Sequence, residues 1–180
     1  MPADKEQIKE AAKYIKKYMS DNPGIKDLTP MYEKYNRDDR MYVSQALMGI
    51  EPWKYMSYIP AFSFHKCEVP TKIVLPIGLK SINGFAFYEC NSLASVTIPD
   101  SVTSIRRYAF YNCGGLTSLA IGKGITHIGD SAFEHCTSLG HIKFNDTIAQ
   151  WESVSIEEDT FIDVPAEKII CSDGITNLRH

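Results

Sequence analysis

Four cysteines of this chain stand 23 residues apart, and other residues recur in step with them. A phenylalanine precedes each cysteine by three positions, and an isoleucine precedes each by eight. The cysteines are Cys67, Cys90, Cys113 and Cys136, the phenylalanines are Phe64, Phe87, Phe110 and Phe133, and the isoleucines are Ile59, Ile82, Ile105 and Ile128. Because chance does not align three such columns over four units, we interpret the chain as a repeat protein.

A period of this length is typical of leucine-rich-repeat solenoids, in which each unit lays one short strand beside the strand of the next. The units align without gaps at 48–70, 71–93, 94–116 and 117–139. In the third unit, alternation places Val96 and Ile98 toward a core and Ser95 and Thr97 toward solvent. The sequence therefore predicts an α/β solenoid: a short leucine-rich-repeat array with a parallel sheet on one face and an N-terminal helical cap.

Residues 1–47 lack the repeat and have the pattern of helices. Apolar residues recur at helical spacing over residues 8–19, with lysines on the other positions, which predicts an amphipathic helix. Thr29 with Pro30 is typical of a second helix start, and Asp38 or Asp39 could cap a third that carries Ala46. We interpret this region as a helical N-terminal cap.

The solenoid is expected over residues 48–144, and a different segment is expected after it. The first unit is degenerate, with Pro52 and Trp53 at strand positions, as is usual where an array meets a cap. A fifth unit begins at Gly140, and the pattern ends at Asn145. Between positions 146 and 173 there are eight acidic residues and one lysine, so residues 145–180 are predicted to form an acidic C-terminal closing segment with a last strand around 168–171.

The unit at 93–116 has the form LxxVTIPxxVTSIxxxAFxxCxxL and resembles the treponemal-type leucine-rich repeat of the BspA-like family. The resemblance covers about residues 55–144, and the pieces AQWESV at 149–154 and IICSDG at 169–174 resemble the way in which many of these arrays finish. It implies a curved right-handed solenoid that serves in protein–protein contact. Several members of the family are bacterial surface adhesins that bind host matrix proteins or other cells.

Composition limits the class of protein, its cellular compartment and its partners. With 44% hydrophobic and 23% charged residues, the 180-residue chain is expected to be globular, and it has no apolar run near the roughly 18 residues needed to cross a bilayer. The charged start MPADKEQIKEAAKYIKKYM lacks a signal-peptide pattern, so we expect a cytoplasmic protein, or a secreted or cell-surface one if a signal peptide has been removed. A net charge of −3 makes nucleic acid an unfavoured partner.

The cysteine column could suggest a zinc site, but its expected geometry disfavours one. Strands about 4.8 Å apart spread four thiols over roughly 14 Å, whereas zinc needs ligands that converge at about 2.3 Å. We therefore expect buried, reduced thiols. His127, Asp130, His135 and Cys136 lie close in sequence, yet Cys136 belongs to the buried column, so we expect no catalytic residues, metal, cofactor or small-molecule substrate.

Two surfaces are candidates for partner binding. The first is lateral and aromatic, because rings recur at two outward positions of successive units and are joined by two arginines. Its residues are Phe62, His65, Phe85, Tyr88, Arg106, Arg107, Tyr108 and Tyr111. Tyrosine and arginine are favoured interface residues, although the rings could serve only to cover neighbouring loops.

The second candidate is the outward face of the predicted sheet, the kind of surface on which solenoids commonly bind partners. Its residues are Ser95, Thr97, Ser118 and Ala120 at the centre, with Lys72, His141 and Lys143 at the ends. The lysines of the first helix are expected to form a solvated face.

We therefore predict a monomeric protein–protein interaction module that works as an intracellular adaptor or as an inhibitor that binds and occludes another macromolecule. Two alternatives stay open. One is the BspA-like surface adhesin implied by the resemblance. The other is a structural unit whose end strands pair with a second copy of the chain.

Overall fold

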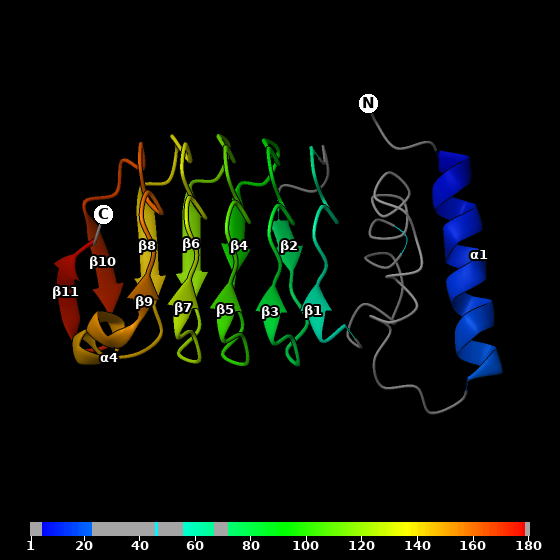
Figure 1. Cartoon of the computed structure of the whole chain (residues 1–180), viewed down its shortest axis with the longest axis horizontal. Coiled ribbons are helices and arrows are strands. Elements are labelled where there is room, and N and C mark those ends of the chain that lie inside the picture. The colour runs from blue at the N-terminus through cyan, green and yellow to red at the C-terminus, as the bar shows by residue number, and fades with distance from the viewer. Residues whose placement is uncertain (1–4, 23–45, 47–55, 67–71, 179–180) are drawn as a thin grey trace.

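The chain winds into a solenoid whose successive turns stack along one axis (Figure 1). This computed structural model describes residues 5–22, 46, 56–66 and 72–178. Each turn contributes one strand to each of two sheets, and the strands of the two sheets run in opposite directions (Figure 1). The predicted leucine-rich-repeat array with a parallel sheet is thus confirmed, and a second parallel sheet, which the sequence did not indicate, lies on another side of the coil.

The six-stranded sheet has the order β11-β10-β8-β6-β4-β2 and is parallel except for its last strand. Its strands are β2 (Lys72–Val74), β4 (Ser95–Thr97), β6 (Ser118–Ile121), β8 (His141–Phe144), β10 (Lys168–Cys171) and β11 (Gly174–Asn177). The register pairs equivalent residues of neighbouring units, so that Val96 lies opposite Leu119 and Leu119 opposite Ile142. These three side chains are buried, as the alternation predicts.

The five-stranded sheet has the order β1-β3-β5-β7-β9 and is wholly parallel. Its strands are only two residues long: β1 (Tyr58–Ile59), β3 (Ser81–Ile82), β5 (Ser104–Ile105), β7 (His127–Ile128) and β9 (Ser155–Ile156). In β1, β3, β5 and β7 the second residue is the isoleucine of the repeat, and it is fully buried. The strands of this sheet directly precede the residues that were predicted to form the outward aromatic surface, so the sheet positions those residues.

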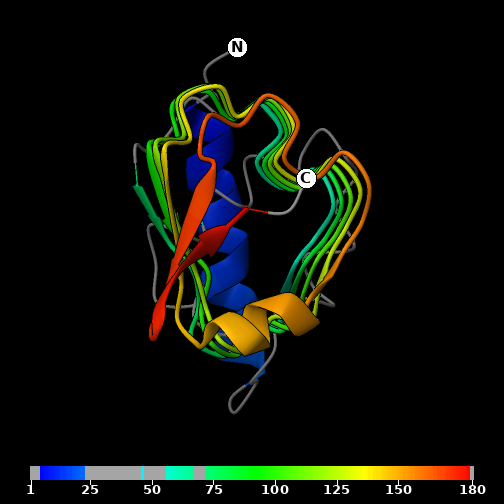
Figure 2. The same ribbon diagram turned by 90° about the vertical axis from the view of Figure 1, so that its left-hand side faces the viewer.

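Stacked phenylalanines form the centre of the core. The rings of Phe64, Phe87, Phe110, Phe133 and Phe161 lie nearly parallel, with centroids 4.8, 4.9, 5.1 and 5.6 Å apart in turn. All five are buried in the core of the coil, whose successive turns superimpose in the end-on view of Figure 2. Each turn therefore buries its apolar face only against its neighbours.

A tight turn with two left-handed residues follows each strand of the five-stranded sheet. In the unit that contains Phe87, these residues are Phe85, with φ 60°, and Glu89, with φ 56°. This conformation directs alternate amides toward the next turn, where Phe87 N donates to Ala109 O at 2.7 Å and Glu89 N donates to Tyr111 O at 2.8 Å. The irregular backbone thus satisfies its hydrogen bonds between turns.

Beyond Asn145, where the 23-residue pattern ends, the same two sheets continue. β9 pairs with β7 and β10 pairs with β8, both in parallel, and Phe161 stacks on Phe133 from 28 positions further along the chain. The longer step accommodates a helix, α4 (Ile148–Ser153), at the lower edge of the coil in Figure 2. The predicted last strand around 168–171 is confirmed as β10, and β11 then turns back antiparallel to it.

Helix α4 is held by a cap and by one buried ring. The side chain of Thr147, the N-cap residue, accepts a hydrogen bond from Gln150 N at 3.2 Å. Trp151 is fully buried and packs against Phe144, with ring centroids 5.4 Å apart. The inserted helix therefore belongs to the same core.

The helix predicted near the N-terminus is present as α1 (Lys5–Asp21), beyond the β1 end of the array (Figure 1). Ile15 is fully buried, whereas Lys9 and Lys13 are exposed and form ion pairs with Glu6 and Glu10. The two further helices that the sequence predicts before residue 48 lie outside the described residues except for Ala46, which is buried. Cys67 also lies outside them.

The stacked core gives a first prediction. Phe110→Ala should lower the free energy of unfolding by about 3–5 kcal/mol, because it removes a fully buried ring that contacts a ring on each side. Urea denaturation followed by circular dichroism measures the change. The exposed Lys123→Ala is the control, with an expected change within about 0.5 kcal/mol, and equal stabilities of the two variants would contradict the packing described here.

A matched pair of glycines tests the close approach of successive turns. A Cβ at Gly124 would lie 2.0 Å from the carbonyl oxygen of Asp100 in the preceding turn, whereas a Cβ at Gly140 would have no atom within 4 Å. Gly124→Ala should therefore cost at least about 2 kcal/mol of unfolding free energy, and Gly140→Ala less than about 0.5 kcal/mol. Thermal denaturation of both variants checks this, and a similar loss at the two positions would refute it.

Candidate partner-binding surface

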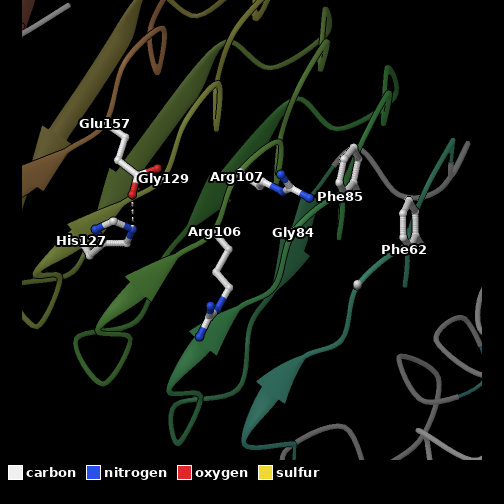
Figure 3. Close-up of a pocket in the computed structure, with 9 residues that line it drawn as sticks. Phe62, Gly84, Phe85, Arg106, Arg107, His127, Gly129 and Glu157 are labelled. Carbon is white, nitrogen blue, oxygen red and sulfur yellow. Dashed lines mark ion pairs between the residues drawn. The ribbon is translucent and has the colours of Figure 1, made fainter.

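A groove of about 450 Å³ runs along the side of the solenoid where the strands of the five-stranded sheet end (Figure 3). We call this side the lateral face. The residues that line the groove are Ala61, Phe62, Gly84, Phe85, Arg106, Arg107, His127, Gly129 and Glu157. Because these residues come from equivalent parts of five successive turns, the groove follows the axis of the array.

One end of the groove is bordered by a stack of aromatic rings. Phe62, Phe85 and Tyr108 have ring centroids 4.9 and 5.0 Å apart, and the rings of Phe62 and Phe85 lie parallel in Figure 3. All three side chains are half-buried. The predicted outward aromatic column is therefore present, and its rings cover one another while part of each remains open to solvent.

A second aromatic column lies beside the first. His65, Tyr88 and Tyr111 have ring centroids 5.4 and 5.0 Å apart, and Tyr88 lies 5.6 Å from Phe85 in the adjacent column. Burial raises the pKa of both tyrosine hydroxyls, with the negative charge of Glu89 as a further cause at Tyr88. Both hydroxyls therefore stay protonated at neutral pH and can donate hydrogen bonds.

Two exposed arginines lie at the middle of the groove. Within the described part of the chain, no carboxylate lies within 4 Å of the guanidinium of Arg106 or Arg107. Figure 3 shows Arg107 extended toward Phe85 and Arg106 pointing in a different direction. The sequence prediction that arginines join the aromatic columns is thus consistent with their positions.

Glycines in the turns on either side of Arg107 allow its backbone to approach them closely. A Cβ at Gly129 would lie 2.6 Å from Arg107 N, and a Cβ at Gly84 would lie 3.0 Å from Arg107 O. Neighbouring turns therefore approach the arginine backbone too closely for a side chain at these places. Sequence reasoning missed the groove, although the small residues Ala61 and Gly84 of one column and Gly129 of the adjacent column were its signal.

The far end of the lateral face is acidic. Glu157 forms an ion pair with His127 at 3.3 Å, which Figure 3 marks, and its other oxygen accepts a hydrogen bond from Asp130 N at 2.8 Å. Glu158 and Asp159 follow it and are exposed. The lateral face therefore changes along the axis from aromatic to basic to acidic.

A histidine also links the last two turns at the acidic end. His135 Nδ1 lies 2.7 Å from an oxygen of Asp163, and His135 Nε2 lies 3.4 Å from an oxygen of Glu134. The ring of His135 is 5.3 Å from that of Tyr111 and meets it edge to face. The aromatic column and the acidic end are thus continuous.

The second predicted surface lies on the outward side of the six-stranded sheet. Ser95, Ser118 and His141 are aligned across β4, β6 and β8, and Thr97 is aligned with Lys143 through the intervening strand. These side chains are exposed or half-buried, as expected. Because they lie on the six-stranded sheet, whereas the arginines follow strand β5 of the other sheet, the candidate residues form two surfaces rather than one site.

Two exposed isoleucines extend this strand face and were not singled out from the sequence. Ile170 in β10 and Ile175 in β11 lie opposite each other in the antiparallel pair, and their exposed fractions are 48% and 61%. Alternate residues of a strand face outward, and the sequence did not indicate that residues 174–177 form a strand or which of them face outward.

The cysteine column is structural in the described turns. The thiols of Cys90, Cys113 and Cys136 are buried and donate hydrogen bonds to backbone carbonyl oxygens of the preceding turn, at 2.6, 3.0 and 3.2 Å. The prediction of buried, reduced thiols is confirmed for these three, and Cys171 is also buried and unbridged. Over residues that the structure describes, no group of three or more potential metal ligands converges.

The possible catalytic group noted in the sequence is split between interior and surface. The Cys136 thiol donates to Phe110 O inside the coil, whereas His135 pairs with Asp163 outside it. A nucleophile and its base must lie within hydrogen-bond reach, so these residues do not act together.

These features define a leucine-rich-repeat solenoid, a class of fold that serves as a binding scaffold. The chain belongs to the BspA-type leucine-rich-repeat family, whose model matches residues 57–180 with six copies of the repeat. The match extends the family pattern beyond Asn145, in agreement with the strands found there. Comparisons with curated proteins and with solved structures each found no match.

Family membership indicates a protein-interaction module with protein partners. No helix in the ranges described here is long and apolar enough to cross a bilayer.

The buried thiols predict a pH dependence of stability. Burial raises the pKa of the Cys113 thiol well above its ordinary value of 9.0, so above about pH 9 the unfolded chain loses a proton that the folded chain keeps. The free energy of unfolding should therefore hold below pH 9 and fall as the pH rises further. Urea titrations from pH 7 to 10.5, about the range over which unfolded thiols ionise, measure this.

The control is Cys113→Ala, which lacks the titrating thiol. Above pH 9 the free energy of unfolding of this variant should fall less steeply than that of the unmodified protein, and the two slopes should differ by up to about 1.4 kcal/mol per pH unit. Parallel curves for the two proteins would show that the thiol does not contribute.

Proposed function

We propose that this protein is an adaptor or inhibitor that binds and occludes another macromolecule through its lateral face. The observation that supports this most directly is the exposed pair Arg106 and Arg107, without carboxylate partners in the described chain, beside half-buried rings and a groove of about 450 Å³. A charge that the protein itself leaves unneutralised can be neutralised by a partner.

The lateral face is favoured over the strand face by its side chains. Arginine and tyrosine dominate the binding energy of protein interfaces, whereas serine and threonine are under-represented among the residues that matter most. The rings of Phe85, Tyr88 and Tyr111 are also fixed by stacking, so little conformational entropy is lost when they are covered. The strand face around Thr97 and Ser118 offers mainly small polar groups.

Surface adhesion is the second candidate, and family membership is the observation that supports it. An adhesin would use the same lateral face on a host matrix protein or on another cell. The two candidates share a binding surface and differ in the partner, so one set of variants tests both.

Partner capture with the purified chain provides the test. We expect Arg106→Glu with Tyr111→Ala to reduce recovery of the partner at least about tenfold, because two interface residues worth roughly 1–2 kcal/mol each are removed. Ser118→Glu on the strand face is the matched control and should leave recovery unchanged. Circular dichroism confirms that all variants are folded.

Partners are sought in two places, a lysate of the producing cells and a panel of immobilised matrix proteins. Specific recovery from the lysate favours the adaptor or inhibitor, and binding to the panel favours the adhesin. Loss of binding on Ser118→Glu, with full binding by the lateral variant, would disprove the lateral site.

A further inference from the structure

We propose that the lateral groove binds an extended peptide segment of the partner in which an acidic side chain lies between an aromatic side chain and a basic one. This inference rests on the proposed function and names the chemistry of the partner. It follows from the order in which three kinds of side chain occur along the axis: rings, then arginines, then carboxylates.

The aromatic end of the groove determines the first side chain of the bound peptide. Phe62 and Phe85 line the groove, and their parallel rings are 4.9 Å apart (Figure 3). Because Tyr108 stacks 5.0 Å beyond Phe85, the ring faces are turned toward one another and the ring edges are left open. A ring laid against these edges gains apolar burial and the edge-to-face geometry that aromatic pairs favour. An apolar, preferably aromatic, side chain is thus the complement of this end.

The centre of the groove determines the second side chain of the bound peptide. Arg106 and Arg107 are exposed, and the described residues place no carboxylate within 4 Å of either guanidinium. Gly84 and Gly129 line the groove beside the arginines and contribute no side chains to it. A carboxylate fits the planar fork of a guanidinium with two hydrogen bonds, which makes it the natural occupant.

The acidic end of the groove determines the third side chain of the bound peptide, and it disfavours ligands with many negative charges. Glu157 lines the groove two turns beyond the arginines, with Glu158 and Asp159 exposed beside it. A ligand with regularly repeated negative charge, such as a nucleic acid or an anionic membrane, meets these carboxylates as soon as it extends past the arginines. A basic side chain is instead attracted there, so a peptide of mixed charge is favoured over a polyanion.

The spacing suits an extended chain. Successive turns are about 5 Å apart, so the rings of the second turn, the arginines of the third and the carboxylates of the fifth are separated by about 5 and 10 Å. In an extended peptide, side chains on one face recur about every 6.7 Å. Alternate positions of the peptide, with flexible acidic and basic side chains, therefore reach the three regions in order.

Synthetic peptides of about 11 residues, blocked at both ends, test this order. Each carries one phenylalanine, one aspartate and one lysine at alternate positions in a glycine–serine background. The three peptide forms differ only in which of these residues is central, because reversing the chain direction exchanges the outer two. Fluorescence polarisation should show binding at least about fivefold tighter for the form with central aspartate than for the other two.

Arg106→Glu should reverse this preference and make the form with central lysine the tightest binder. Lys123→Glu changes the net charge equally at an exposed site outside the groove, and it should keep the original order. Equal binding of the three forms, or no binding of any form up to about 1 mM, would overturn the inference.

Two polyanionic probes complete the experiment: an oligothymidylate of about 12 nucleotides, and vesicles of phosphatidylcholine with phosphatidylserine at about 2:1. Neither should bind in a way that depends on Arg106, and such binding would assign the arginines to phosphate instead. If partner capture depends on Arg106 and Tyr111 while peptide order has no effect, only the mixed-charge inference fails. If capture does not depend on them, the lateral site itself fails.

Discussion

The in-register hydrogen bonding of one turn to the next determines the rest of this structure. The amides of each turn donate to carbonyl groups of the turns on both sides, as Phe87 N does to Ala109 O in the following turn and Arg106 N does to Ile82 O in the preceding one, and this holds equivalent residues about 5 Å apart. Stacked phenylalanines and buried thiols are then consequences, because any residue repeated in the sequence must lie directly over its counterpart. A single residue type can in this way form a continuous column, in the core or on the surface.

The same constraint gives the lateral face its polarity. Where the column holds Phe62, Phe85 and Tyr108, the rings stack, and where the sequence changes to Ser131 and Asp159, the stack ends. Arginines in one turn and glutamates two turns later lie in line for the same reason. The surface can therefore change from aromatic to basic to acidic along the axis without a change in the backbone, because one or two residue differences in each turn are sufficient.

Much of the fold could be predicted because buried columns recur with a fixed period. The inward positions of Val96, Leu119 and Ile142 and the strand at 168–171 follow from that period alone. The five-stranded sheet could not be predicted because strands of two residues are too short to alternate. The turn with Phe161 was hidden because helix α4 lengthens its step to 28 residues. The residues of the candidate site were recognisable as outward. Their grouping could not be predicted, because it depends on which sheet each residue follows and on how closely successive turns approach, as at Gly84 and Gly129.

The left-handed residue that follows each strand of the five-stranded sheet has a consequence for how such a surface can change. Phenylalanine, tyrosine, serine and aspartate occupy this position in successive turns, and φ stays between 52° and 62° throughout. The conformation is thus imposed by the hydrogen bonds between turns and not by the side chain. The residue at this position can therefore be exchanged in one turn while the scaffold is left intact. Where the position reaches the surface, as at Phe85, Tyr108 and Asp159, both natural variation and engineering can change the specificity of the surface one turn at a time.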